Sequence, residues 1–268
     1  MISVKELPIL SFDTIARMED MSWFTDAKIF DDLIIVSQKE TCCYIWKTGI
    51  GLVIFDAIWP DERVYYSIMD AIEKAGWTSE KIVALFMTHG HIDHVGCGKW
   101  LVDHCNLKTY LSSKDDALRL GTPDEPNRSG TWKEFSISRY IKDGDILVFG
   151  DKQVHVVATP AHTEGCMSFI FPVTDNCEKH MAGLFGGATA PWNNPEGRAV
   201  QLQSVEKFKS AMHAYGVDVA LTNHTAFDNG LEKIAYSRKR MAHLPNIYIL
   251  GEEGAQKFCD VYRRVAEE

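Results

Sequence analysis

The sequence predicts a single α/β domain built in layers, and three observations support this prediction. Apolar runs that suit buried strands occur in clusters, and segments that suit helices lie between them, from about residue 30 to the end of the chain. No stretch rich in Pro, Gly or Ser marks a linker. The length of 268 residues corresponds to about 1.8 domains at roughly 150 residues each, which allows one large domain. We therefore expect one domain over residues 1–268.

Composition and charge exclude several classes of protein. The chain is 46% hydrophobic and 24% charged, which is typical of a folded globular protein and excludes a disordered or fibrous one. A net charge of −9 disfavours binding to nucleic acid. The start MISVKELPIL lacks the apolar core of a signal peptide, and no apolar run is long enough to span a membrane, so we expect a cytoplasmic protein. The seven cysteines include no CxxC motif and predict free thiols.

The first half of the chain predicts strands before helices. The strands are short apolar runs over residues 33–36, 44–46, 52–55, 82–87 and 107–111. A helix is expected over 63–74, because Val64, Ile68 and Ile72 form one stripe, and another over 99–105. The polar segment 121–140 predicts either a long loop or a small insertion.

The second half repeats the pattern. Strands are expected over 146–149, 154–158, 168–173, 181–185 and 217–221, and helices over 204–215, 231–243 and 255–266. The turn Gly150-Asp151 joins the first two of these strands. The alternation of strands and helices continues to the end of the chain, which favours one layered domain over two.

The strongest chemical signal is HGHIDH at residues 89–94, directly after a predicted buried strand. His89 and His91 are two residues apart and can point to one side of an extended turn, while Asp93 and His94 can point to an adjacent position. Imidazole and carboxylate ligands together suit zinc, and also iron or manganese. A lone histidine is more often structural than a ligand, but three histidines and an aspartate at this spacing favour a metal site.

This segment resembles the metal-binding signature of the metallo-β-lactamase superfamily. Three other segments resemble family motifs, in the family's order: GLVIFD at 51–56, a strand that ends in Asp; TPAHTEG at 159–165, similar to TPGHTxG; and LTNH at 221–224, a late strand followed by a ligand histidine. The resemblance spans residues from about 30 to 230. It implies a four-layer αββα sandwich with the metal site at one edge of the two sheets.

The resemblance also implies two zinc ions per chain and their ligands. The ligands of the first ion are His89, His91 and His162, and those of the second are Asp93, His94 and His224. Asp56 is a candidate for the carboxylate that accepts the other ring N–H of a ligand histidine, with the capping of a turn as the equal alternative. Trp192 and Asn193 are candidates for contacts with substrate, although packing is the commoner role of an aromatic residue.

One departure from the family pattern indicates which branch of the superfamily the chain resembles. Many members carry a metal-bridging Asp in a Gly-Asp pair after a strand, whereas residues 184–189 read LFGGAT. The glyoxalase-like and lactonase-like branches use that Asp, so its absence here disfavours both. The chain is more similar to the metallo-β-lactamase subclass with an Asp-His-His second site, which has a Phe-Asp pair after its last ligand, as in Phe227-Asp228.

These residues and the resemblance together imply an enzyme, a di-zinc hydrolase. A metal-bound hydroxide would attack the carbonyl of a small cyclic amide, lactone or other acyl compound, and Asp93 would be the catalytic residue that orients it. Two alternatives are a two-metal phosphodiesterase, which the acidic net charge disfavours, and an iron-dependent oxidoreductase of the same fold, which the intact ligand set disfavours. We expect a small-molecule substrate and no nucleic-acid or membrane partner, and the oligomeric state is left open.

Overall fold

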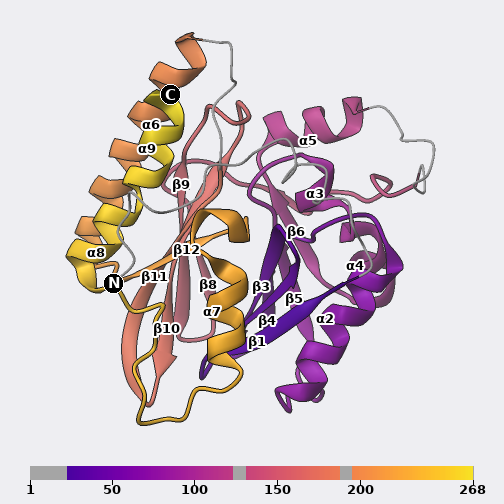
Figure 1. Cartoon of the computed structure of the whole chain (residues 1–268). Helices are drawn as coiled ribbons and strands as arrows, with labels where there is room; N and C mark the ends of the chain where they lie inside the picture. Colours follow the sequence, from indigo (N-terminus) through magenta and orange to yellow (C-terminus); the bar gives the residue numbers. More distant parts are fainter. Residues whose placement is uncertain (1–22, 123–130, 188–194, 268) are drawn as a thin grey trace.

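Two β-sheets pack face to face between two layers of helices (Figure 1). The computed structural model describes residues 23–122, 131–187 and 195–267. This arrangement confirms the predicted α/β class and the αββα sandwich. Within the described residues, no helix is both long and apolar enough to cross a membrane.

The first sheet has seven strands whose spatial order is their chain order. They are β1 (Thr25–Phe30), β2 (Leu33–Gln38), β3 (Thr41–Thr48), β4 (Gly51–Phe55), β5 (Ile82–Phe86), β6 (Lys108–Leu111) and β7 (Arg139–Tyr140). The strands from β1 to β4 are antiparallel, and β4 to β7 are parallel. Helix α2 (Glu62–Lys74) connects β4 to β5, and the Asp61 side chain caps its first turn by accepting a hydrogen bond from the Arg63 N–H.

The second sheet has five strands in the order β12-β11-β10-β9-β8. They are β8 (Ile146–Phe149), β9 (Lys152–Ala158), β10 (Met167–Asp175), β11 (Glu178–Phe185) and β12 (Val219–Thr222). The first four pair in antiparallel fashion, and β12 lies parallel to β11 after the long helix α6 (Pro195–Ala214). A parallel pair needs such a crossover, because the chain must return to the end of the sheet where the first strand of the pair begins.

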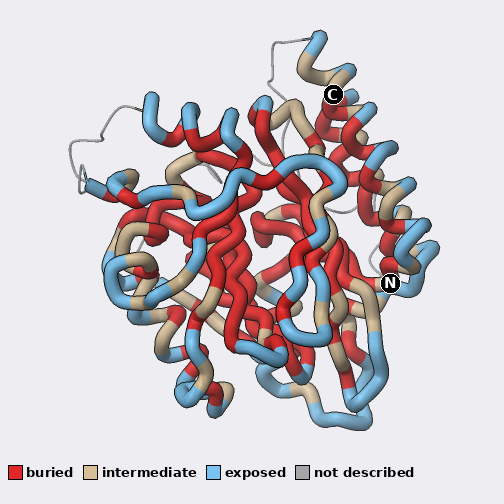
Figure 2. Tube along the Cα trace, turned by 180° about the vertical axis from the view of Figure 1, so that it is seen from behind, coloured by how far each residue is buried: buried red, intermediate tan, exposed pale blue. Residues whose placement is uncertain are grey.

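Helices cover the outer face of each sheet (Figure 1). Helices α2 and α4 (Gly98–His104) pack on the first sheet, and α6, α8 (Gly251–Phe258) and α9 (Asp260–Glu267) pack on the second. The central strands are therefore mostly buried, as their red colour in Figure 2 shows. Along β4, Val53 and Phe55 face the other sheet while Leu52 and Ile54 face the helices, which explains its unbroken apolar sequence.

One edge of the sandwich collects the ends of strands from both sheets. β4 and β5 end there in one sheet, β11 and β12 end there in the other, and β10 begins beside them. Main-chain hydrogen bonds join the two sheets at this edge: Met167 N–H donates to Thr88 O at 2.9 Å, and Cys42 N–H donates to Asn223 O at 3.0 Å. The loops that follow these strands are thus held close together.

The predicted elements differ from the structure in several places. Strands β1 and β7 and helices α3 (Ile92–Val95) and α5 (Ser113–Gly121) were missed, because none of them has a continuous apolar run or stripe. The single helix expected over 255–266 was wrong, since α8 and α9 are separate helices with Cys259 between them. The helix expected over 231–243 is shorter, because α7 (Gly230–Ser237) ends before the segment that contains Pro245.

Candidate metal centre

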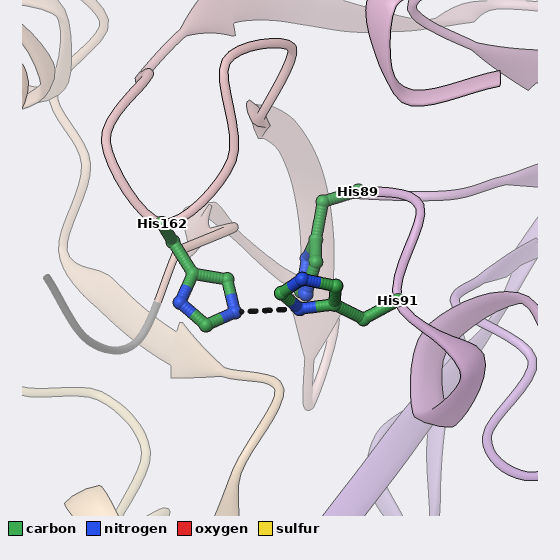
Figure 3. A group of neighbouring side chains, drawn as sticks. All are labelled: His89, His91 and His162. Atoms are coloured by element: carbon green, nitrogen blue, oxygen red, sulfur yellow. Dashed lines mark hydrogen bonds between the residues drawn. The ribbon is translucent and has the colours of Figure 1, made fainter. Parts of the chain in front are cut away.

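Three histidines from two loops form the first cluster of potential ligands. His89 and His91 lie in the loop after β5, and His162 lies between β9 and β10. Figure 3 shows the rings of the three residues turned toward one another, with a dashed line between His91 and His162. His91 Nδ1 lies 3.0 Å from His162 Nε2. One ligand atom of each side chain lies within 4.8 Å of the others. The structure thus brings together the residues that the resemblance assigns to the first metal.

The second cluster lies beside the first. Asp93 and His94 belong to the short helix α3, and His224 follows β12. His94 Nε2 is 3.2 Å from His224 Nε2 and 3.3 Å from Asp93 Oδ2. The rings of His89 and His94 have centroids only 4.1 Å apart, so the two clusters adjoin.

The spacing of these atoms fits divalent metal ions. Ligand atoms at about 2.0–2.1 Å from a tetrahedral zinc ion lie about 3.3 Å from one another. The separations of 3.0, 3.2 and 3.3 Å in the two clusters are close to this value. His89 Nε2 is buried and has no hydrogen-bond partner among the described residues, and a bound cation would satisfy it.

Asp56 orients one histidine of each cluster. This fully buried carboxylate accepts a hydrogen bond from His94 Nδ1 at 2.8 Å, which leaves His94 Nε2 free to face the second cluster. The Thr88 hydroxyl donates to Asp56 at 2.9 Å and lies 3.0 Å from His89 Nδ1, from which it can accept a hydrogen bond. His89 Nε2 is then left unprotonated toward the first cluster. Asn223 donates to the same carboxylate at 3.2 Å.

Burial and neighbouring charges shift the pKa values of the candidate ligand side chains. Burial, together with His94, lowers the pKa of His224 to about 3, and burial also holds the pKa of His89 well below its usual value. Burial opposes protonation of His94 as well, but Asp93 and Asp56 raise its pKa to about 10. Burial opposes ionisation of Asp93, yet His94 and the other histidines hold its pKa far below its usual value. Neutral imidazoles and an ionised carboxylate are the forms that bind metals.

We expect Asp56→Asn to weaken metal binding at the second cluster by about ten- to a hundredfold, the usual cost of losing a carboxylate behind a ligand histidine. The amide cannot accept all the hydrogen bonds that now converge on Asp56. Competition with a chromophoric chelator measures the affinity. Asp32→Asn is a matched control, because Asp32 is also buried and accepts hydrogen bonds from Lys152 and Thr174 N–H, away from both clusters. Equal losses in both variants would contradict the role of Asp56.

The loop that carries His162 contains an unusual backbone conformation. Ala161, directly before the candidate ligand His162, has φ of 146°, a region that favours glycine. The family motif quoted above has Gly at this position. The loop therefore holds Ala161 in a strained conformation, which costs about 1–3 kcal/mol for a residue with a Cβ.

Ala161→Gly should raise the free energy of unfolding of the metal-free protein by about 1 kcal/mol. The free energy gained by relieving the backbone strain would exceed the free-energy cost of the extra conformational entropy that glycine gives the unfolded chain. Urea unfolding measures the change. Ala211→Gly within α6 is the control and should lower the same quantity by about 1 kcal/mol. If Ala161→Gly lowered the free energy of unfolding as much as the control does, the backbone at Ala161 would not be strained.

Space is restricted at the end of β11, where many family members carry a bridging Asp. A Cβ added at Gly186 would lie 2.0 Å from Met167 O, and one at Gly187 would lie 3.0 Å from His162 Cβ. Neither position accepts a side chain without movement of its surroundings. Trp192 and Asn193, the predicted substrate contacts, lie outside the described residues.

Sequence reasoning missed two residues that contact this site. Asn223 bonds both to Asp56 and to Gly186 O at 3.0 Å, so it joins the two sheets behind the clusters. Its position directly before His224 was the available signal. Thr41 lies with its hydroxyl 3.5 Å from Asp93 Oδ2, and no local motif marks it.

Comparison with known proteins gives two kinds of relatives. Hydroxyacylglutathione hydrolase of Chelativorans sp. (strain BNC1) is 30% identical over 125 residues, which are 47% of this chain and 40% of that protein. Hydroxyacylglutathione hydrolase GloC of Haemophilus influenzae is 26% identical over 140 residues, 51% of this chain and 63% of that protein. The chain thus spans 40–63% of the length of these two curated relatives.

Solved structures resemble the chain over most of its length. The subclass B3 metallo-β-lactamase BJP-1 of Bradyrhizobium japonicum has a TM-score of 0.72 and 23% identity, and the likeness covers 91% of each chain. The metallo-β-lactamase FEZ-1 of Legionella gormanii has a TM-score of 0.73 and 16% identity, over 91% of this chain and 94% of that one. At these identities the likeness establishes the fold. The family model of the metallo-β-lactamase superfamily matches residues 40–176, about half of the sequence, and the chain belongs to that superfamily.

Proposed function

We propose that this protein is a hydrolase that holds two zinc ions and cleaves a small acyl compound. The observation that carries the proposal is the pair of adjoining clusters, each with three ligand atoms within 4.8 Å of one another. The names of the curated relatives support hydrolysis, since they are called hydrolases. Zinc is the proposed metal because imidazole with a single carboxylate is a common zinc ligand set.

The first cluster would hold one ion with three imidazoles, and the second would hold the other with Asp93, His94 and His224. Bound zinc ions supply a hydroxide nucleophile at neutral pH and polarise a substrate carbonyl. With three protein ligands each, both sites leave a coordination position open, as catalytic zinc sites do.

The residues around the clusters prepare the site before any substrate arrives. Asp56, with Thr88 and Asn223, fixes which ring nitrogen of His94 and His89 faces the clusters. Asp93 is buried beside His94 and His224, and its carboxylate would accept a hydrogen bond from a nucleophilic water bound at the site. Preorganised groups of this kind need no rearrangement during the reaction.

Two substrate classes enter the proposal from the relatives: a hydroxyacylglutathione and a β-lactam. The likeness to β-lactamases covers 91% of the chain, whereas the likeness to the Chelativorans hydrolase covers 47%. Both reactions break a bond at an acyl carbonyl carbon, so we propose acyl transfer to water as the common chemistry and a cyclic amide or lactone as the first substrate to test.

A panel of substrates tests this proposal. Zinc-loaded protein would be assayed with a chromogenic β-lactam, a lactone, a nitrophenyl ester, a glutathione thioester and a nitrophenyl phosphodiester. We expect hydrolysis of at least one carbonyl substrate, lost on treatment with a chelator and restored by zinc. Protein that retains two zinc ions and cleaves no carbonyl substrate would contradict the proposal. A phosphodiester rate above every carbonyl rate would indicate phosphodiester chemistry instead.

A further inference from the structure

The first turn of α5 lies against both loops of the first cluster. This helix begins after Ser112, whose hydroxyl accepts a hydrogen bond from Asp115 N–H at 3.1 Å. Asp115 is only 1% exposed although it carries a carboxylate on a helix without an apolar stripe. A buried carboxylate costs free energy unless it makes hydrogen bonds, so its partners indicate its role.

The side chain of Asp115 holds the loop that carries His162. The Thr163 hydroxyl donates to Asp115 Oδ2 at 2.8 Å, and the Gly165 backbone N–H also donates to this carboxylate. The contact is close, because a Cβ added at Gly165 would lie 2.1 Å from Ser112 Oγ. Two hydrogen bonds to one carboxylate thus fix the chain directly after His162.

The backbone of the same residue contacts the other loop. A Cβ added at Gly90, which lies between His89 and His91, would be 2.3 Å from Asp115 O. Glycine at this position lets the loop approach the helix. Asp115 therefore touches both segments that supply the three histidines of the first cluster.

We infer that Asp115 is a positioning residue that holds the His162 loop against the His89–His91 loop and so sets the geometry of the first metal cluster. This inference rests on the proposed metal-binding function. The ligands of the second cluster come from α3 and the end of β12, and Asp56 orients His94 among them. Loss of the Asp115 carboxylate should accordingly act on one site and spare the other.

The test is metal binding by the full chain, measured with Zn²⁺ in competition with a chromophoric chelator and with the visible absorption of bound Co²⁺. Asp115→Ala should lower the affinity of the first site about tenfold or more, the size of effect found when groups that orient ligands are removed. The second site should stay within about twofold of wild type. Asp115→Asn should restore first-site affinity to within about threefold of wild type, because the amide keeps the shape and one acceptor oxygen.

Asp116→Asn is the matched control. Asp116 is the adjacent residue, is also buried, and bonds to Arg119 and to the Tyr140 hydroxyl instead of the metal loops. This variant should lose stability and keep both affinities. The inference would be overturned if both sites of Asp115→Ala kept wild-type metal affinity, or if both sites lost affinity to the same extent.

Two further outcomes keep the test decisive. If Asp115→Ala does not fold, Thr163→Val takes its place, because it removes only the hydroxyl that bonds to Asp115. It should weaken metal binding at the first site about threefold, and an unchanged affinity would overturn the inference. A wild-type protein that binds neither Zn²⁺ nor Co²⁺ would instead contradict the proposed function.

Discussion

Asp93→Asn should lower kcat by at least about a hundredfold while the fold stays intact. The substitution keeps the size of the side chain and replaces one carboxylate oxygen with an NH₂ group, which donates a hydrogen bond instead of accepting one. Asp93 lies 3.3 Å from His94 Nε2 and within reach of the Thr41 hydroxyl, at the border of the second cluster. Loss of a group that orients a ligand or moves a proton has an effect of this size.

Steady-state kinetics on the best substrate of the panel measures this effect, with metal content determined on the same sample. Asp103→Asn is the control, because Asp103 is an exposed carboxylate that pairs with Lys99 on α4 and should show wild-type turnover. Near-normal turnover in Asp93→Asn with both ions retained would contradict the catalytic role of Asp93.

His224→Ala and His162→Ala should each lose metal from a different site. Each cluster offers three candidate ligands. Removal of one imidazole should weaken binding of its ion by about ten- to a hundredfold or more, since even the loss of a group that only orients a ligand has an effect of this size. Without a side chain at Gly186 or Gly187 to compensate, the second site depends on its three ligands. After mild dialysis, His224→Ala should keep about one ion, held by His89, His91 and His162.

Elemental analysis of both variants and of wild type after the same dialysis decides this prediction. His104→Ala is the control, since His104 bonds to Trp100 O on α4, away from the clusters, and should keep both ions. Retention of two tightly held ions by His224→Ala would show that His224 is not a ligand, and the likeness to an Asp-His-His second site would lose its support at this end of the chain.

The layered fold was predictable because its strands are marked by local sequence. β4 and β5 are buried on both faces and read as unbroken apolar runs, and α2 carries a clear stripe. α5 was not predictable in this way, because the residues that it buries are Asp115, Asp116 and Arg119, which the sequence presents as a solvated face. Its burial depends on an internal ion pair and on contacts with loops far along the chain.

The candidate ligands were predictable for a different reason. HGHIDH gathers four of them in six residues, and the remaining two follow strands whose ends meet at one edge. The sequence could not predict the roles of Asn223, Thr41 and Asp115. Each acts through a contact with a residue more than 45 positions away, and no local pattern encodes such a contact. The strain at Ala161 also required the backbone torsion angle.

Zinc stoichiometry of the wild-type chain tests the central claim most directly. The protein would be equilibrated with excess Zn²⁺, passed through a desalting column and analysed for zinc per chain. The two adjoining clusters predict two ions per chain that survive this treatment, one with each group of three ligands. Zinc well below one ion per chain would contradict the account, since neither cluster would then act as a metal site.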